Sequence, residues 1–154
     1  MLKIIISGGQ TGADRAGLEA ASVLKFQTGG FCPKGYLTES GKDISLKKFG
    51  LKQVRTPKYE ERTIKNVLSG DGTVIFCRLG HYAEIIGDGS KLTFETAVKN
   101  NKPVIVNPSK RKFLKWLTEN DIEVLNVAGN RESQYPGIFK KTKIFLIKAL
   151  SEYE

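Results

Sequence analysis

The chain has 154 residues, 40% hydrophobic and 27% charged, which suits one soluble domain with a buried core. Its 25 Lys and Arg against 16 Asp and Glu give a formal net charge of +9, which favours anionic partners, although dispersed basic residues also fit simple solubility. No run approaches the ~20 apolar residues of a membrane span, the run Ile4–Ile6 is too short for a secretory leader, and no zinc-ligand or nucleic-acid-binding pattern is present. We therefore expect a cytoplasmic protein with no structural metal that binds neither a membrane nor a nucleic acid.

Strand and helix patterns alternate along the first half of the chain. Leu2–Ser7 is continuously apolar and predicts a buried strand. Gly12–Leu24 predicts a helix whose inner face consists of small residues, which would let it pack close to a sheet. Residues 26–48 are loop-rich because of their glycines and proline, and residues 51–54 predict a short strand. Thr56 and Pro57 predict the start of a helix that runs to about residue 69.

The second half of the chain continues the alternation. We expect strands at residues 72–77, 103–106 and 124–127, and helices at residues 91–100, 112–119 and 136–153. Apolar strands alternating with helices predict one α/β domain over residues 1–154, a three-layer α/β/α sandwich with a mostly parallel central sheet. In such folds ligands bind beyond the carboxyl ends of the strands, so the loops that follow the strands are the candidate site.

A first glycine-rich turn joins the first strand to the first helix. It contains Gly8, Gly9, Gln10, Thr11 and Gly12. Glycines there let the backbone approach a phosphate, and first-turn amides of the helix point at it. The turn lacks the Lys-Ser/Thr ending of a triphosphate-binding loop, and a simple tight turn is the alternative interpretation. Asp14 follows Thr11 by three residues, which fits either a capping box or a contact to a ribose hydroxyl.

A second glycine loop, residues 87–90, enters the helix predicted at residues 91–100. Gly89 lies in the loop, Ser90 is the expected cap of the helix, and Thr93 and Glu95 fall in its first turns. Two such loops at neighbouring strand ends predict a phosphate site, whereas a flexible loop is the alternative. Glu95 is the candidate general base or ribose-orienting carboxylate.

Two cations and one helical stripe complete the candidates. Arg131 follows the last strand and offers a bidentate fork for phosphate, with a surface salt bridge as the alternative. Lys34 is a further possible phosphate contact. One side of the helix from residue 57 carries a polar stripe that faces solvent, a ligand or a second subunit: Tyr59, Arg62, Thr63 and Asn66.

The two cysteines and the single histidine give little chemistry. Cys77 ends an apolar run and is expected to pack as a small hydrophobic side chain. Cys32 lies in the loop-rich segment, where a reactive thiol is conceivable. A disulfide is not expected in a cytosolic chain of this kind.

Seven ordered motifs resemble the putative molybdenum carrier family, a circularly permuted branch of the SLOG superfamily that is similar to Lonely Guy nucleotide phosphoribohydrolases. The motifs span nearly the whole chain: residues 5–15, 28–35, 59–67, 71–73, 92–95, 126–133 and 136–138. The resemblance implies a Rossmann-like sheet and a nucleotide or molybdopterin-type ligand. It also implies that Gly8, Gly9, Gly12 and the turn at residues 90–93 hold phosphate, and that Glu95 matches the acidic residue of the second glycine motif. The chain departs from the family's pattern in its longer, more polar second glycine loop and in Asn130, which replaces a usual Pro.

The sequence therefore predicts a carrier or nucleotide-binding sensor that holds a phosphorylated ligand. The predicted ligand-binding residues are Gly8, Gly9, Gln10, Thr11, Gly12, Asp14, Lys34, Gly89, Ser90, Thr93, Glu95 and Arg131. The alternative is an N-glycosidic hydrolase of nucleoside monophosphates, in which Glu95 and Arg131 are catalytic. A third hypothesis is a partner-binding domain that uses the Tyr59 stripe, and we expect a homo-oligomer.

Overall fold

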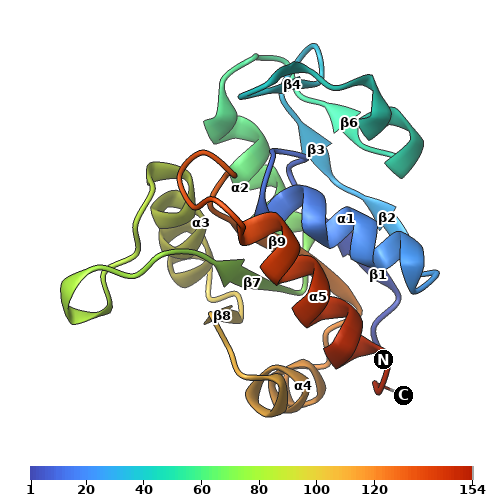
Figure 1. The fold of residues 1–154 in the computed structure, drawn as a ribbon, viewed down its shortest axis with the longest axis vertical. Coiled ribbons are helices and arrows are strands. Elements are labelled where there is room, and N and C mark those ends of the chain that lie inside the picture. The colour runs from blue at the N-terminus through green and yellow to red at the C-terminus, as the bar shows by residue number, and fades with distance from the viewer. Residues whose placement is uncertain (154) are drawn as a thin grey trace.

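The computed structural model describes residues 1–153, and its centre is a parallel sheet of five strands (Figure 1). The strand order is β2-β1-β9-β7-β8, and all pairings are parallel. The strands are β1 (Ile4–Ile6), β2 (Gln27–Gly29), β7 (Gly72–Phe76), β8 (Val104–Val106) and β9 (Val124–Gly129). All five strands therefore end at the same edge of the sheet, where the loops after β1, β7 and β9 meet.

Five helices among the described residues cover the two faces of this sheet (Figure 1). They are α1 (Ala13–Val23), α2 (Tyr59–Ser69), α3 (Asp88–Lys99), α4 (Lys110–Glu119) and α5 (Ile138–Leu150). Helix α1 packs along α5, which also contacts α4, while α2 packs along α3 on the other face. The predicted three-layer Rossmann-like fold is confirmed.

Small side chains allow α1 to lie close to the sheet, as its sequence predicts. A Cβ atom on Gly17 would lie 2.7 Å from the Cβ of Val127 in β9, so only glycine fits this approach. Ile5, Val74 and Leu125 from three neighbouring strands are fully buried beneath the helices. Burial of such side chains contributes roughly 1.5–3 kcal/mol each to stability, before the entropy cost of folding is subtracted.

The segment expected to be loop-rich, residues 26–48, is more regular than predicted. Its first residues form β2, the edge strand of the main sheet; a strand of three residues with the sequence Gln-Thr-Gly carries no apolar pattern to reveal it. Further on, β3 (Phe31–Cys32) pairs with β6 (Lys52–Gln53), β4 (Leu37–Thr38) pairs with β5 (Gly41–Lys42), and Ile44–Phe49 is a 3₁₀ helix. These elements pack a small second core over α1 that consists of Leu18, Cys32, Leu46, Phe49 and Leu51.

The helix boundaries differ from the prediction by up to three residues, and one of these differences moves the candidate site. Helix α3 begins at Asp88 with Gly87 as its N-cap, so Ser90 lies inside the first turn and does not cap the helix. Helix α2 begins at Tyr59, because the Thr56 hydroxyl accepts a hydrogen bond from Lys58 N in a separate turn before the helix. Helix α5 covers residues 138–150, a shorter span than the predicted 136–153.

The loop between β7 and α3 projects from the body of the protein (Figure 1). It is closed at its base by a bridge between Leu79 and Ile85, and it contains a short 3₁₀ turn at residues 81–83. Tyr82 at its tip is fully exposed, and both Tyr82 and Ala83 have positive φ angles. No helix in residues 1–153 is long and apolar enough to cross a membrane.

Candidate anion-binding site

A cavity of about 320 Å³ lies where the loops after β1 and β9 meet the start of α2 and of α3. It is lined by Gln10, Tyr59, Glu60, Arg62, Thr63, Asp88, Gly89, Ser90, Leu92, Gly129, Arg131 and Gln134. The cavity therefore brings together the second glycine loop, Arg131 and one residue of the first glycine loop, Gln10.

The first glycine turn uses most of its amides inside the protein. Gly9 N–H donates to Ser7 Oγ at 3.2 Å, Gln10 N–H to Asp14 Oδ2 at 3.1 Å, and Thr11 N–H to its neighbour Gln10 Oε1 at 3.0 Å. These three donors are already satisfied, so they are not available to a phosphate. The binding roles of Gly8, Gly9 and Gly12 remain predictions.

A buried ion pair fills the space beside this turn. Arg62 Nη1 lies 2.9 Å from Asp14 Oδ2, and only 12% and 5% of these side chains are exposed. Burial raises the pKa of Asp14, although the Arg62 charge and the Gln10 N–H oppose that rise. The guanidinium presses on Gly8, where an added Cβ would lie 1.8 Å from Arg62 Nη1. Asp14 forms no capping box, because the N-cap of α1 is Gly12 and has no side-chain hydrogen bond.

Arg62 also presents an unpaired donor, and a second arginine lies near it. Arg62 Nε is buried without a hydrogen-bond partner, which is costly unless a ligand or water accepts from it. The Arg62 and Arg131 guanidinium carbons lie 5.5 Å and 5.8 Å from the centre of the Tyr59 ring. Two positive charges therefore converge on one aromatic side chain at the cavity.

The second glycine loop differs from the first because its amides are open. The first N–H groups of any α-helix have no intrahelical acceptor, and those of α3 belong to Asp88, Gly89 and Ser90, which line the cavity. No heavy atom lies within 4 Å of the position that a Cβ on Gly89 would occupy. The hydroxyls beside it have protein partners: Ser90 Oγ accepts from Asn130 Nδ2 at 3.3 Å, and Thr93 Oγ1 donates to Gly89 O at 2.8 Å.

Glu39, in the turn between β4 and β5, ties the loops of the site together. Its carboxylate accepts hydrogen bonds from the Thr11 hydroxyl and from the Ser133 hydroxyl and N–H, and it lies 3.8 Å from Arg131 Nε. Burial raises the pKa of Glu39, but these hydrogen bonds and the Arg131 charge outweigh burial and lower it overall. Sequence patterns could not reveal this residue, because its partners lie 28 and 94 positions away.

The architecture and the motifs agree with comparisons to known proteins. The sequence model of the circularly permutated YpsA SLOG family matches residues 5–150. The chain belongs to this family. A crystal structure from Syntrophus aciditrophicus SB, named putative molybdenum carrier protein, has 36% sequence identity and a TM-score of 0.84, over 96% of this chain and 94% of that one. No curated protein matches the chain.

Several residues expected in the site of this SLOG protein do not line the anion-binding cavity. Three of them line a separate cavity on the other side of the first glycine turn: Gly9, Thr11 and Gly12. Glu95 is exposed on α3 and lines a different cavity together with Phe94 and Val106. Lys34 is exposed before β4 and does not line the anion-binding cavity. Because α3 begins at Asp88, Glu95 lies about two turns further along the helix than the first-turn amides.

The polar stripe of α2 faces inward. Tyr59, Arg62 and Thr63 line the cavity, and Asn66 is buried, where its amide donates to Phe31 O and accepts from Phe31 N, both at 2.9 Å. The stripe therefore faces the candidate ligand site and not the solvent.

The thiols and the acidic side chains offer no evident metal chemistry. Cys32 belongs to β3 and is fully buried, which corrects its expected place in a loop with a reactive thiol. Burial raises the pKa of both Cys32 and Cys77 to about 11, so both are protonated at neutral pH. In residues 1–153, no group of three or more His, Cys, Asp or Glu side chains is arranged to hold a metal ion.

Proposed function

We propose that this SLOG-family protein holds a phosphorylated ligand, a nucleotide or a molybdopterin-type cofactor, and acts as its carrier or sensor. The observation that carries the proposal is the pairing of Arg62 and Arg131 with the open first turn of α3 in one cavity. The family membership and the similar protein named as a molybdenum carrier support the same class of ligand.

The chemistry of this cavity suits a phosphate group. A helix N-terminus offers amide donors and a partial positive charge, and an arginine offers a planar fork of donors for phosphate oxygens. The unpaired Arg62 Nε is a further donor that a bound oxygen would satisfy. Because its ion pair with Asp14 fixes this guanidinium, little side-chain entropy would be lost when the ligand binds.

The rest of the cavity suits the polar part of a nucleoside or pterin. Glu60 and Asp88 also line it, and carboxylates accept hydrogen bonds from ribose hydroxyls or ring amines. The volume of about 320 Å³ lies at the small end of the range for small-molecule pockets, roughly 300–1,000 Å³. A single mononucleotide-sized ligand fits this space better than an extended dinucleotide.

Binding without turnover is the function that the geometry supports best. The hydrolase alternative assigns the catalytic carboxylate to Glu95, which lines a separate cavity. Arg131 lines the anion-binding cavity, which supports a phosphate contact under either hypothesis. Assembly into a homo-oligomer stays a prediction that light scattering would test.

Ligand-dependent thermal unfolding tests the proposal. A ligand present at one hundred times its dissociation constant adds about 2.7 kcal/mol of stability, which raises Tm by several degrees in a domain of this size. We expect AMP, inorganic phosphate or molybdate to raise the Tm of the native protein and Arg131→Gln to abolish the rise. The matched control is Arg111→Gln on α4, an exposed arginine outside the cavity.

Native mass spectrometry of gently purified protein extends the test to ligands that are not commercially available and that co-purify with the protein. A co-purifying nucleotide or pterin that Arg131→Gln removes would support the proposal. If no anion shifts Tm and no small molecule co-purifies, the proposed function is wrong.

A further inference from the structure

A second cavity lies at the same edge of the sheet, beyond the carboxyl ends of β7 and β8. Its volume is about 470 Å³, and it shares no lining residue with the anion-binding cavity. Its lining includes the apolar side chains of Phe76, Pro108 and Phe145 together with Arg78, Tyr135 and Lys141. The cavity thus combines apolar surface with two cations.

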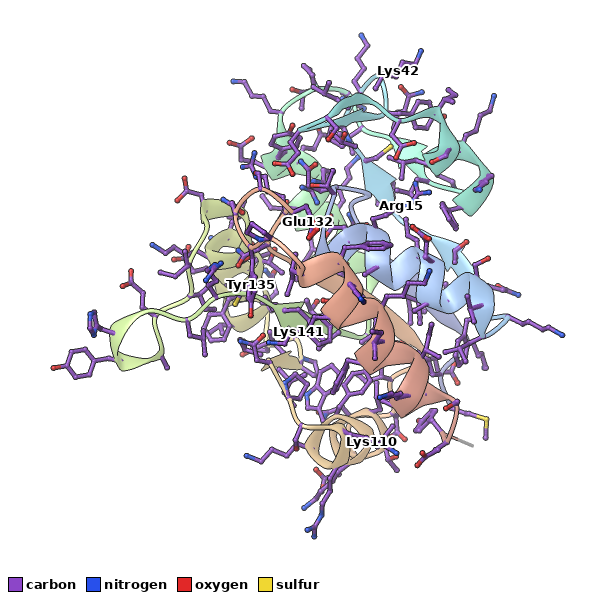
Figure 2. The ribbon with its side chains drawn as sticks, viewed as in Figure 1. Arg15, Lys42, Lys110, Glu132, Tyr135 and Lys141 are labelled. Atoms are coloured by element: carbon purple, nitrogen blue, oxygen red, sulfur yellow. The ribbon has the colours of Figure 1, made fainter. Side chains whose placement is uncertain are left out.

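The two cations are held on one aromatic ring. The Arg78 guanidinium carbon lies 4.3 Å from the centre of the Tyr135 ring, and Lys141 Nζ lies 5.5 Å from it. Lys141 Nζ also donates to Tyr135 Oη at 3.1 Å, and these two residues stand together near the start of α5 (Figure 2). Arg78 Nε donates to Gln134 O at 3.2 Å, which orients the fork while its other nitrogens stay open.

These positive charges lack the acidic partners that other basic residues have. Arg15, for example, contacts both Glu19 and Asp43. Within residues 1–153, neither Arg78 nor Lys141 is within ion-pair distance of a carboxylate. Because neither cation has a carboxylate partner in the described part of the chain, an external anion bound beside this apolar surface would supply the missing negative charge.

Part of the cavity lining is hydrocarbon surface. Phe76 and Phe145 pack edge to face, with ring centres 5.4 Å apart. The Asn107 amide accepts from Cys77 N at 3.0 Å and donates to Cys77 O at 2.8 Å, so the backbone at the end of β7 is already satisfied. A ligand here therefore buries an apolar body without leaving these polar groups unpaired.

We propose that this cavity binds a small carboxylate with a hydrocarbon or aromatic body. The carboxylate lies between Arg78 and Lys141, and the apolar body covers Phe76 and Phe145. This site is independent of the phosphorylated ligand, because the two cavities have separate linings.

Ligand-observed NMR titrations with octanoate, 1-octanol and inorganic phosphate test this site in the intact protein. We expect saturable binding of octanoate, with weaker binding of octanol and of phosphate, which each lack one half of the required chemistry. Arg78→Gln and Lys141→Gln should each weaken octanoate binding about tenfold, the loss expected for one charge-assisted hydrogen bond. Lys140→Gln is the matched control, because Lys140 is exposed and lies outside the cavity lining.

A second pair of variants tests the apolar half through exposed positions that should tolerate change. Leu79 lines the cavity and is 45% exposed, whereas Leu68 on α2 is 44% exposed and lies outside it. Leu79→Asp should repel octanoate, and Leu68→Asp should leave its binding unchanged. The proposal is overturned if octanol binds as tightly as octanoate, if Lys140→Gln weakens binding as much as Lys141→Gln, or if octanoate does not bind.

Two variants distinguish a failure of this proposal from a failure of the proposed function. Arg131→Gln should leave octanoate binding unchanged, and Lys141→Gln should leave the phosphate-dependent rise in Tm unchanged. If Arg131→Gln weakens octanoate binding, the carboxylate occupies the anion-binding cavity and the second site does not exist.

Discussion

The two glycine loops differ in what their amides do. They follow β1 and β7, which flank β9 in one sheet and are not the neighbouring strands that the sequence predicts. In the first, the N–H groups of Gly9, Gln10 and Thr11 donate to protein oxygens, and Arg62 covers Gly8. In the second, the residues of the first turn of α3 line a cavity, and a Cβ on Gly89 would meet no atom from another part of the protein within 4 Å. A glycine-rich turn therefore has two distinct uses, to let protein groups approach the backbone closely or to leave the backbone open for a ligand.

The largest effect is expected when the Arg62 guanidinium, which covers the first loop, is removed. Arg62→Met leaves the Asp14 carboxylate buried without its counter-charge, which should cost about 3–5 kcal/mol of unfolding free energy. Urea denaturation measures the loss. In the double variant with Asp14→Asn, the total cost should be smaller than the sum of the two single costs. Additive costs would mean that the two side chains do not stabilise the turn as a pair.

The second largest effect is expected from matched alanine substitutions in the two loops, which should differ in their stability cost. A Cβ on Gly12 would lie 2.3 Å from Asn130 O, at a φ of 78°, so Gly12→Ala should cost at least about 2 kcal/mol. Gly89→Ala meets no atom within 4 Å and lies in a helix, so it should change stability by no more than about 1 kcal/mol. Thermal unfolding of both variants checks the comparison, which fails if Gly89→Ala is the more damaging change.

Glu39 links the first loop to the loop that carries Arg131, and its effect should depend on pH. Its folded-state pKa is below the ordinary value of 4.5, so its stabilisation is present at neutral pH and is lost as the pH falls through that value and below it. Glu39→Gln should cost about 1–2 kcal/mol at pH 7, because it weakens charge-assisted hydrogen bonds, and much less at an acidic pH low enough to protonate the Glu39 carboxylate. Denaturation at several pH values measures this, with the exposed Glu119→Gln as a control that should show little effect at any pH. A cost for Glu39→Gln that is the same at both pH values would rule out this role.

The smallest expected effect is the reactivity of the two thiols, one near each loop. Cys32 packs in the core beneath the first loop and is 0% exposed, while Cys77 borders the cavity after β7 and is 2% exposed. With pKa values of about 11, both should react slowly with a disulfide reagent at pH 7.5 and quickly after unfolding. Cys77 should react before Cys32 in the native protein, as mass spectrometry of timed samples would show. The reverse order would indicate that the first loop opens more readily.

The sequence predicted four of the five sheet strands and all five helices, because apolar strands and the order of elements encode these features locally. It missed β2, whose sequence Gln-Thr-Gly carries no apolar pattern. It predicted the inward-facing stripe of α2 only as one of three alternatives, since polarity does not distinguish a buried ion pair from a solvated face. Arg62 and its partner Asp14 are 48 positions apart in the sequence, so no periodicity links them. Glu39 was missed for the same reason, since its three contacts join segments that only the folded chain brings together.

The position of Glu95 shows how a small error at a helix boundary changes a functional hypothesis. The sequence predicts the helix from residue 91, which places Glu95 in its first turns, near the glycine loop. The helix begins three residues earlier, so the first-turn amides belong to residues 88–90 and Glu95 lies on an outer face. A capping signal at Gly87 would have been needed to find this, and glycine is a weaker N-cap signal than Ser.

The strand order has a consequence for how the chain matures during synthesis. The strand β9 lies between β1 and β7, although it is the last of the five to emerge. Until it is made, β1 and β7 have no neighbour on their inner edges, and the helices that cover them have an incomplete surface to pack on. Synthesis at about 5–20 residues per second leaves those edges exposed for several seconds. Completion of the core is therefore a late event that joins distant parts of the chain, and a nascent chain stalled before β9 would be a natural substrate for chaperones.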